Sequence, residues 1–178
     1  MILAVGGKEP RIAPEAFVAT SAVLIGDVAL EEGASVWYQA VLDGGQGPVR
    51  IGARSNVQDG AILTGTADAP LTVGARVSIG HGALLSGCRV EEGALIAIRA
   101  AVLEGAMVGA EAIVGAGAVV PPGGAVPPRT LVLGNPATPM RAVSDDEIAE
   151  NRRRVARYSA LARDYQATGQ AAPEGGAE

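Results

Sequence analysis

The chain has 178 residues, 14 Lys or Arg against 19 Asp or Glu, and 48% hydrophobic residues, but only one Phe and one Trp. This length suits one domain with its own core, and the acidic balance argues against a nucleic-acid-binding surface. A single Cys excludes an internal disulfide, and no run of about 18 apolar residues suggests a membrane span, so we expect a cytoplasmic protein.

From Ile12 to Val126 an apolar residue recurs every six positions, apart from one five-residue step and two interruptions at residues 44–48 and 65–70. A small residue, usually Ala, follows most of these positions four places later. This period is typical of a parallel β-helix of hexapeptide repeats, in which three hexads close a triangular coil. We therefore expect an all-β solenoid over residues 1–143. The repeating residues are Ile12, Val18, Leu24, Leu30, Val36, Leu42, Ile51, Val57, Leu63, Val73, Ile79, Leu85, Val90, Ile96, Val102, Val108, Val114, Val120 and Val126.

The repeat also sorts the outward side chains onto three faces. One face shows polar residues such as Glu31, Arg50 and Thr72, which suit water. Another shows an apolar strip, and so long a strip predicts burial in a subunit interface. A closed homotrimer of triangular prisms would bury it without leaving an open contact. The strip comprises Val23, Ile25, Val41, Ile62, Leu84, Ala101, Leu103 and Val119.

The repeat ends before Ser144, which starts a capping-box pattern with Glu147 three residues later. A C-terminal α-helix is therefore expected over residues 144–167. An apolar stripe on this helix should dock on a face of the β-helix. The Gly, Ala, Pro and Glu content of residues 168–178 predicts a disordered tail. The stripe comprises Ile148, Val155, Tyr158, Ala162 and Tyr165.

Five segments carry a resemblance to a known family: VWYQAV, VRIGARSNVQDG, SIGHGALLSGC, IVGAGAVVPPG and LVLGNPA. These segments, the two interruptions and the five-residue step all fall where the γ-class carbonic anhydrase family has them. The chain resembles that family over nearly its whole length. The resemblance implies a left-handed parallel β-helix, a homotrimer and sites at the subunit interfaces.

The resemblance also implies where zinc would bind. In the family three His ligands, two from one subunit and one from the next, occupy the positions of Thr64, Ser86 and His81. Here only His81 remains, and it is the only His in the chain. Neutral hydroxyls are poor zinc ligands, so we expect no metal site and no cofactor. The repeat places Thr64 and Ser86 one coil apart on the apolar face, and His81 at a corner, where it would meet those hydroxyls of a neighbouring chain.

Other positions depart from the family as well. Asn56, Gln58 and Asp59 match its NxQD segment, whereas Asp43 stands where the family has the Arg that pairs with this Asp. Asp59 is therefore expected to lack its partner. Arg99, which the repeat places one coil above Gly82, is a candidate to restore a positive charge beside Asp59.

Cys88 lies seven residues after His81, but a lone Cys in such a repeat is more often a small core residue than a ligand.

Three functions are weighed on these residues. Zinc-dependent CO2 hydration is disfavoured because its ligand set is absent. A zinc-independent trimer could bind a small molecule at its interfaces, or use His81 as a general acid or base. The alternative to this function is a protein whose only role is structural assembly. CoA-dependent acyl transfer is the third, although His81 lies inside the repeat rather than on a long loop. The candidate catalytic residues are His81, Asp59 and Gln58, and the candidate binding residues are Asn56, Asp43, Thr64, Ser86 and Arg99.

Overall fold

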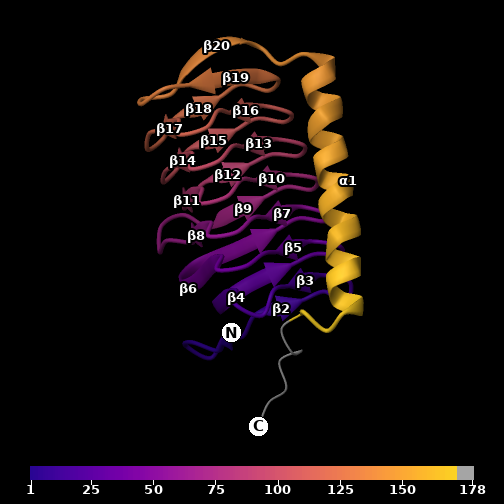
Figure 1. Cartoon of the computed structure of the whole chain (residues 1–178). Coiled ribbons are helices and arrows are strands. Elements are labelled where there is room, and N and C mark those ends of the chain that lie inside the picture. The colour runs from indigo at the N-terminus through magenta and orange to yellow at the C-terminus, as the bar shows by residue number, and fades with distance from the viewer. Residues whose placement is uncertain (172–178) are drawn as a thin grey trace.

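The computed structural model describes residues 1–171, which form a triangular β-helix with one α-helix along its side (Figure 1). All strand pairs are parallel except the last, β19 with β20. β4 and β6 are long strands that bend round a corner and contribute to two faces. The repeat and the fold class predicted from it are thereby confirmed.

The strands lie on three faces. Face 1 holds β1 (Ile2–Leu3), the first parts of β4 (Val23–Leu30) and β6 (Val41–Ile51), β8 (Ile62–Thr64), β11 (Leu84–Ser86), β14 (Ala101–Val102) and β17 (Val119–Val120). Face 2 holds β2 (Arg11–Ile12), the second parts of β4 and β6, β9 (Leu71–Val73), β12 (Arg89–Val90), β15 (Met107–Val108) and β18 (Ala125–Val126). Face 3 holds β3 (Phe17–Val18), β5 (Ser35–Val36), β7 (Asn56–Val57), β10 (Ser78–Ile79), β13 (Leu95–Ile96), β16 (Ile113–Val114), β19 (Thr130–Leu133) and β20 (Thr138–Ala142).

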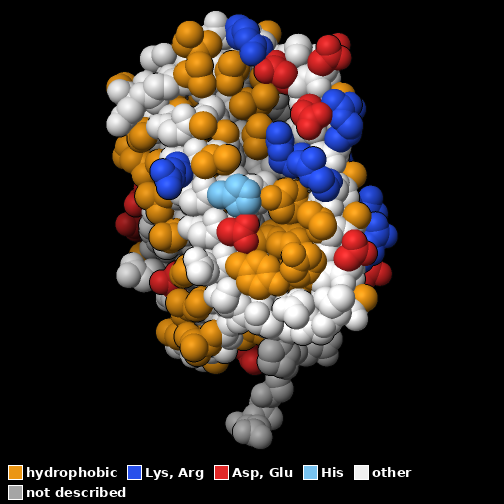
Figure 2. All heavy atoms as spheres, viewed as in Figure 1, with side chains coloured by type: hydrophobic (Ala, Val, Ile, Leu, Met, Phe, Trp, Pro, Cys, Tyr) orange, Lys and Arg blue, Asp and Glu red, His pale blue; other side chains and the backbone are white. Residues whose placement is uncertain are grey.

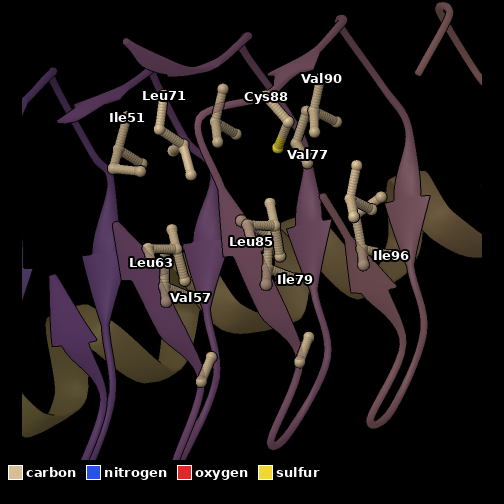
Figure 3. Packing of buried hydrophobic residues seen from close by; sticks show 14 of the residues in the cluster. Ile51, Val57, Leu63, Leu71, Val77, Ile79, Leu85, Cys88, Val90 and Ile96 are labelled. Atoms are coloured by element: carbon tan, nitrogen blue, oxygen red, sulfur yellow. The ribbon is translucent and has the colours of Figure 1, made fainter. Parts of the chain in front are cut away.

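The core consists of the repeating apolar residues stacked in rows along the coils. Leu63 pairs in register with Leu85, and both are fully buried (Figure 3). Each such side chain contributes roughly 1.5–3 kcal/mol by leaving water. Cys88 is 2% exposed and belongs to this core, as expected.

Six residues of the apolar strip form one ladder on face 1, from Val23 to Val119, whereas Ile25 pairs with Asp43 in the next column. Val41 pairs with Ile62, Ile62 with Leu84 and Leu84 with Ala101. Ile62 keeps 43% of its surface exposed and Leu84 40%. A single chain therefore leaves this ladder in contact with water.

Helix α1 (Asp145–Ala167) begins with both hydrogen bonds of the expected capping box at Ser144. It runs back along face 3 of its own chain, from the last coil towards the first (Figure 1). Trp37 on face 3 contacts the rings of Tyr158 and Tyr165, with centroids 5.2 and 5.5 Å away. Asn151 Nδ2 donates to the carbonyl of Gly93 at 2.9 Å. No helix within residues 1–171 is long and apolar enough to cross a membrane.

The first residues of the tail expected from the sequence follow directly on α1. Thr168 caps α1, and Ala171 forms an antiparallel bridge with Ala19. Gln166 Nε2 also donates to the carbonyl of Ala16 at 3.2 Å, so the helix end is fixed to the first coil. Residues 168–171 thus lie against the end of α1 and the first coil, and the rest of the predicted tail, 172–178, lies outside the described residues.

Candidate functional site

His81 lies at the corner between face 3 and face 1, after β10 and before β11. Its Nδ1 is 2.9 Å from Oδ2 of Asp59, which occupies the equivalent corner one coil earlier. The two corners are joined by a backbone hydrogen bond from Gly82 N to the carbonyl of Asp59 at 2.9 Å. The stacking of coils thus forms a His–Asp pair from residues 22 positions apart.

The Asp59 carboxylate is held from both sides. Its Oδ1 accepts a hydrogen bond from the backbone N–H of Tyr38 at 3.2 Å, while Oδ2 faces His81. The side chains of His81 and Asp59 are 47% and 44% exposed, so this pair contributes less than about 1 kcal/mol to stability. Its main effect is orientation. A carboxylate at Nδ1 favours the proton there and leaves Nε2 as the basic nitrogen.

The expectation that Asp59 lacks a partner is wrong, because His81 of the same chain supplies it. The proposed pairing of Asp59 with Arg99 is not formed either: among residues 1–171, Arg99 makes no ion pair. Arg99 N donates to the carbonyl of His81 at 2.9 Å, which places it one coil beyond His81 and two beyond Asp59. Two coils correspond to about 9–10 Å along the axis, and His81 lies between.

The hydroxyl pair is located on face 1. Thr64 Oγ1 donates to Ser86 Oγ at 3.2 Å, and the two residues are in register on β8 and β11. Asp43 is the next residue of the same column, paired with Thr64. Its Oδ1 accepts from the backbone N–H of Gly45 at 2.8 Å. One carboxylate and two hydroxyls therefore line the edge of face 1.

These two groups of residues do not meet within one chain. Thr64 follows Asp59 by five residues, and Ser86 follows His81 by five. β8 and β11 lead away from the corner that carries the His–Asp pair, and Thr64 and Ser86 are the last residues of these strands. The His–Asp pair thus lies at one edge of face 1, and the column of Asp43, Thr64 and Ser86 at the other.

Asn56 and Gln58 are buried polar residues in the segment that leads into Asp59. They are 1% and 4% exposed. Gln58 Nε2 donates to Asn56 Oδ1 at 3.0 Å, and Asn56 Nδ2 donates to Ser78 Oγ at 3.1 Å. This buried hydrogen-bonded chain fixes the backbone that leads into Asp59.

An aromatic cluster beside the His–Asp pair was not predicted as part of the site. Burial raises the pKa of the Tyr158 phenol, and the Asp59 charge raises it further. Tyr38 has its pKa raised by burial and then by Tyr165 and Asp59. Figure 2 shows His81 with an acidic side chain beside it and a hydrophobic patch extending towards α1. The helical spacing of Tyr158 and Tyr165 indicates only a docking stripe, so no sequence signal marks this proximity.

The chain matches no family model. It is nevertheless similar to known proteins in sequence and in structure. The chain is 40% identical over 156 residues to the carnitine operon protein CaiE of Salmonella agona, covering 88% of this chain and 79% of that one. It is also 40% identical over 153 residues to a carbonic anhydrase of Geobacillus kaustophilus, covering 86% and 84%. A candidate acetyltransferase of Bacillus cereus has a similar structure, with a TM-score of 0.93, 34% identity and coverage of 94% and 98%. A hexapeptide transferase family protein of Anaplasma phagocytophilum follows with a TM-score of 0.85, 28% identity and coverage of 93% and 98%.

Proposed function

Because the chain belongs to the γ-class carbonic anhydrase-like family of left-handed hexapeptide β-helices, we propose that it works as a homotrimer with a zinc-independent site at each subunit interface. In this site the His81–Asp59 pair of one subunit faces Thr64, Ser86 and Asp43 of the next. The pair binds a small polar molecule and acts on it as a general base. The observation that carries the proposal is the 2.9 Å contact between His81 Nδ1 and Asp59.

The donor set at this interface does not fit zinc. Catalytic zinc takes three protein ligands with imidazole nitrogen, thiolate or carboxylate oxygen, and keeps a fourth position open. The positions that the family uses provide one imidazole and two neutral hydroxyls, and the hydroxyls are hydrogen-bonded to each other at 3.2 Å. Within residues 1–171 no three His, Cys, Asp or Glu side chains are grouped as a metal site. We therefore assign no reaction step to a metal.

The proposed trimer follows from the position of the two edges of face 1. A cyclic trimer uses one kind of contact three times, so one edge of each subunit meets the opposite edge of the next. One edge carries His81 and Asp59, and the other carries Thr64 and Ser86. The exposed ladder through Ile62 and Leu84 lies between them and supplies the apolar contact.

The chemistry of the site depends on Nε2 of His81. With Asp59 at Nδ1, Nε2 accepts a proton from water or from a hydroxyl group of the bound molecule, and Asp59 stabilises the imidazolium that results. Thr64 and Ser86 offer hydrogen bonds that orient this molecule. Asp43 adds a negative charge at the same edge, which disfavours anionic ligands there.

Acyl transfer is a second candidate because of the structural relatives described as transferases, which cover nearly the whole of this chain. A His held by a carboxylate can remove a proton from an acyl acceptor as readily as from water. Binding of acetyl-CoA, measured as a rise in the thermal midpoint of the trimer, favours this reading. Absence of any shift at millimolar acetyl-CoA disfavours it.

Hydrolysis of 4-nitrophenyl acetate tests the reactivity of His81, as general base towards water or as nucleophile towards the ester, because any imidazole-dependent rate belongs to the only His. We expect protein-dependent hydrolysis by the wild type, its loss in His81→Gln, and a rate lowered about tenfold in Asp59→Asn, a smaller effect than the roughly 100-fold or more for loss of the acid–base group itself. Light scattering should find all three proteins trimeric. Equal rates for wild type and His81→Gln in intact trimers would instead identify a structural assembly protein.

A further inference from the structure

A groove of about 880 Å³ lies on the flank of α1 away from His81. Its floor is the corner between face 2 and face 3, and its wall is α1. Arg152, Ser159 and Arg163 line it from the helix. Tyr158, which faces the His–Asp pair, projects from the other flank, because it lies about 100° round the helix from Ser159. The groove and the site around His81 are therefore separated by α1.

Arginines are concentrated in this groove, although the chain as a whole has a net charge of −5. Four arginines line it, against two glutamates, Glu15 and Glu32. Arg76 is already paired with Glu92, and Arg152 with Glu111 at 2.9 Å. Arg54 and Arg163 have no carboxylate within 4.0 Å among residues 1–171. Two guanidinium groups thus remain available to a ligand.

The backbone presents two of these arginines side by side. Arg54 and Arg76 occupy the same corner position in consecutive coils, about 4.8 Å apart, with φ of +58° and +55°. Gly33 and Gly93 occupy the same position in the coils before and after them, with φ of +65° and +70°. Glycine adopts this left-handed conformation without strain, whereas a side chain with a Cβ costs about 1–2 kcal/mol. Two arginines therefore stand side by side at a position where glycine would cost less backbone energy, and one of them, Arg76, is paired with Glu92.

We propose that this groove binds a phosphorylated small molecule of nucleotide size. Guanidinium groups bind phosphate through two parallel hydrogen bonds, and charge-assisted bonds of this kind are stronger than neutral ones. Pockets for ligands of that size have volumes of roughly 300–1,000 Å³, and this groove lies within that range. Arg54 and Arg163, from the corner and from α1, hold the phosphates from the two walls. Because the arginines are exposed, binding weakens as salt screens them.

Calorimetric titration of the full-length protein with ADP at low ionic strength tests the proposal. Arg54→Gly removes a guanidinium and keeps a residue that suits the positive φ, so it should not disturb the coil. Arg99→Gly is the matched control, because it removes an Arg of φ +55° from the corner beside His81. We expect Arg54→Gly and Arg163→Gln each to raise the ADP dissociation constant about tenfold, Arg99→Gly to leave it unchanged, and Glu32→Gln to lower it.

Titrations with adenosine and with inorganic phosphate show which part of ADP the groove binds. Adenosine should not bind measurably, and phosphate should displace ADP but bind more weakly than ADP. The proposal is overturned if ADP does not bind the wild type, if phosphate binds and ADP does not, or if Arg99→Gly rather than Arg54→Gly abolishes binding. Loss of binding in Arg99→Gly would indicate that ADP binds at the corner that carries His81. None of these outcomes depends on ester hydrolysis by His81, so this proposal and the proposed function fail separately.

Discussion

The apolar ladder on face 1 makes Leu84→Lys the most informative change to the assembly. Leu84 keeps 40% of its surface exposed in one chain. Full burial of a Leu side chain is worth about 1.5–3 kcal/mol, so covering the remaining surface in a trimer contributes roughly 0.6–1.2 kcal/mol per subunit. Lys loses that contribution and places an ammonium group between Ile62 and Ala101, its partners in register.

Burying an unpaired ammonium costs several kcal/mol. The total is therefore at least about 3 kcal/mol per interface, or roughly a 100-fold weaker contact, repeated three times in the trimer. Size-exclusion chromatography with light scattering at micromolar concentration should then find the variant dissociated. Circular dichroism should find it folded, because the core residues beneath Leu84 are unchanged.

Met107→Lys is the matched control. Met107 is an apolar side chain that is 51% exposed on face 2, where the ladder does not run. This variant should remain trimeric. A trimeric Leu84→Lys protein, or equal dissociation of both variants, would show that face 1 is not the subunit interface.

Three further predictions concern single residues. Burial raises the pKa of the Cys88 thiol to about 12, so the native protein should not react with a thiol reagent at pH 8, and labelling faster than unfolding would contradict its core position. The Arg141 side chain and the cap at Ser144 lower the pKa of Glu147 from 4.5 to about 2. Its stabilising contribution is therefore complete above pH 4.5 and is lost as the pH falls towards 2, and Glu147→Gln should remove this acid dependence of thermal unfolding. Leu63→Ala should cost about 2–5 kcal/mol in urea unfolding, and a smaller loss than 1 kcal/mol would argue against a packed row.

The repeat predicts the fold because it is a local rule applied many times. Each hexad places one apolar side chain inside and one corner residue outside, so the column of Thr64 and Ser86 follows from counting. The His81–Asp59 pair was missed although its signal was present. Both residues precede a glycine at the same corner, Gly60 and Gly82, and both glycines have positive φ.

The periodicity of the sequence does not predict which side chains of α1 lie beside Asp59 and which line the groove. The apolar stripe indicates that α1 docks on a face, but the register of docking depends on particular contacts such as Asn151 with Gly93. That register decides which side chains of α1 lie beside Asp59 and which line the arginine groove. The hexad and the helical stripe are both local patterns. The position of α1 relative to the coils depends on tertiary packing, which neither pattern specifies.

The zinc content of a reconstituted interface tests the central claim most directly. Thr64→His combined with Ser86→His restores three imidazoles only if His81 of one subunit meets residues 64 and 86 of the next. Elemental analysis should find zinc far below one equivalent in the wild type, about one per subunit in the double variant, and little once His81→Ala is added. Stoichiometric zinc in the wild type, or none in a trimeric double variant, would contradict the zinc-independent interface site.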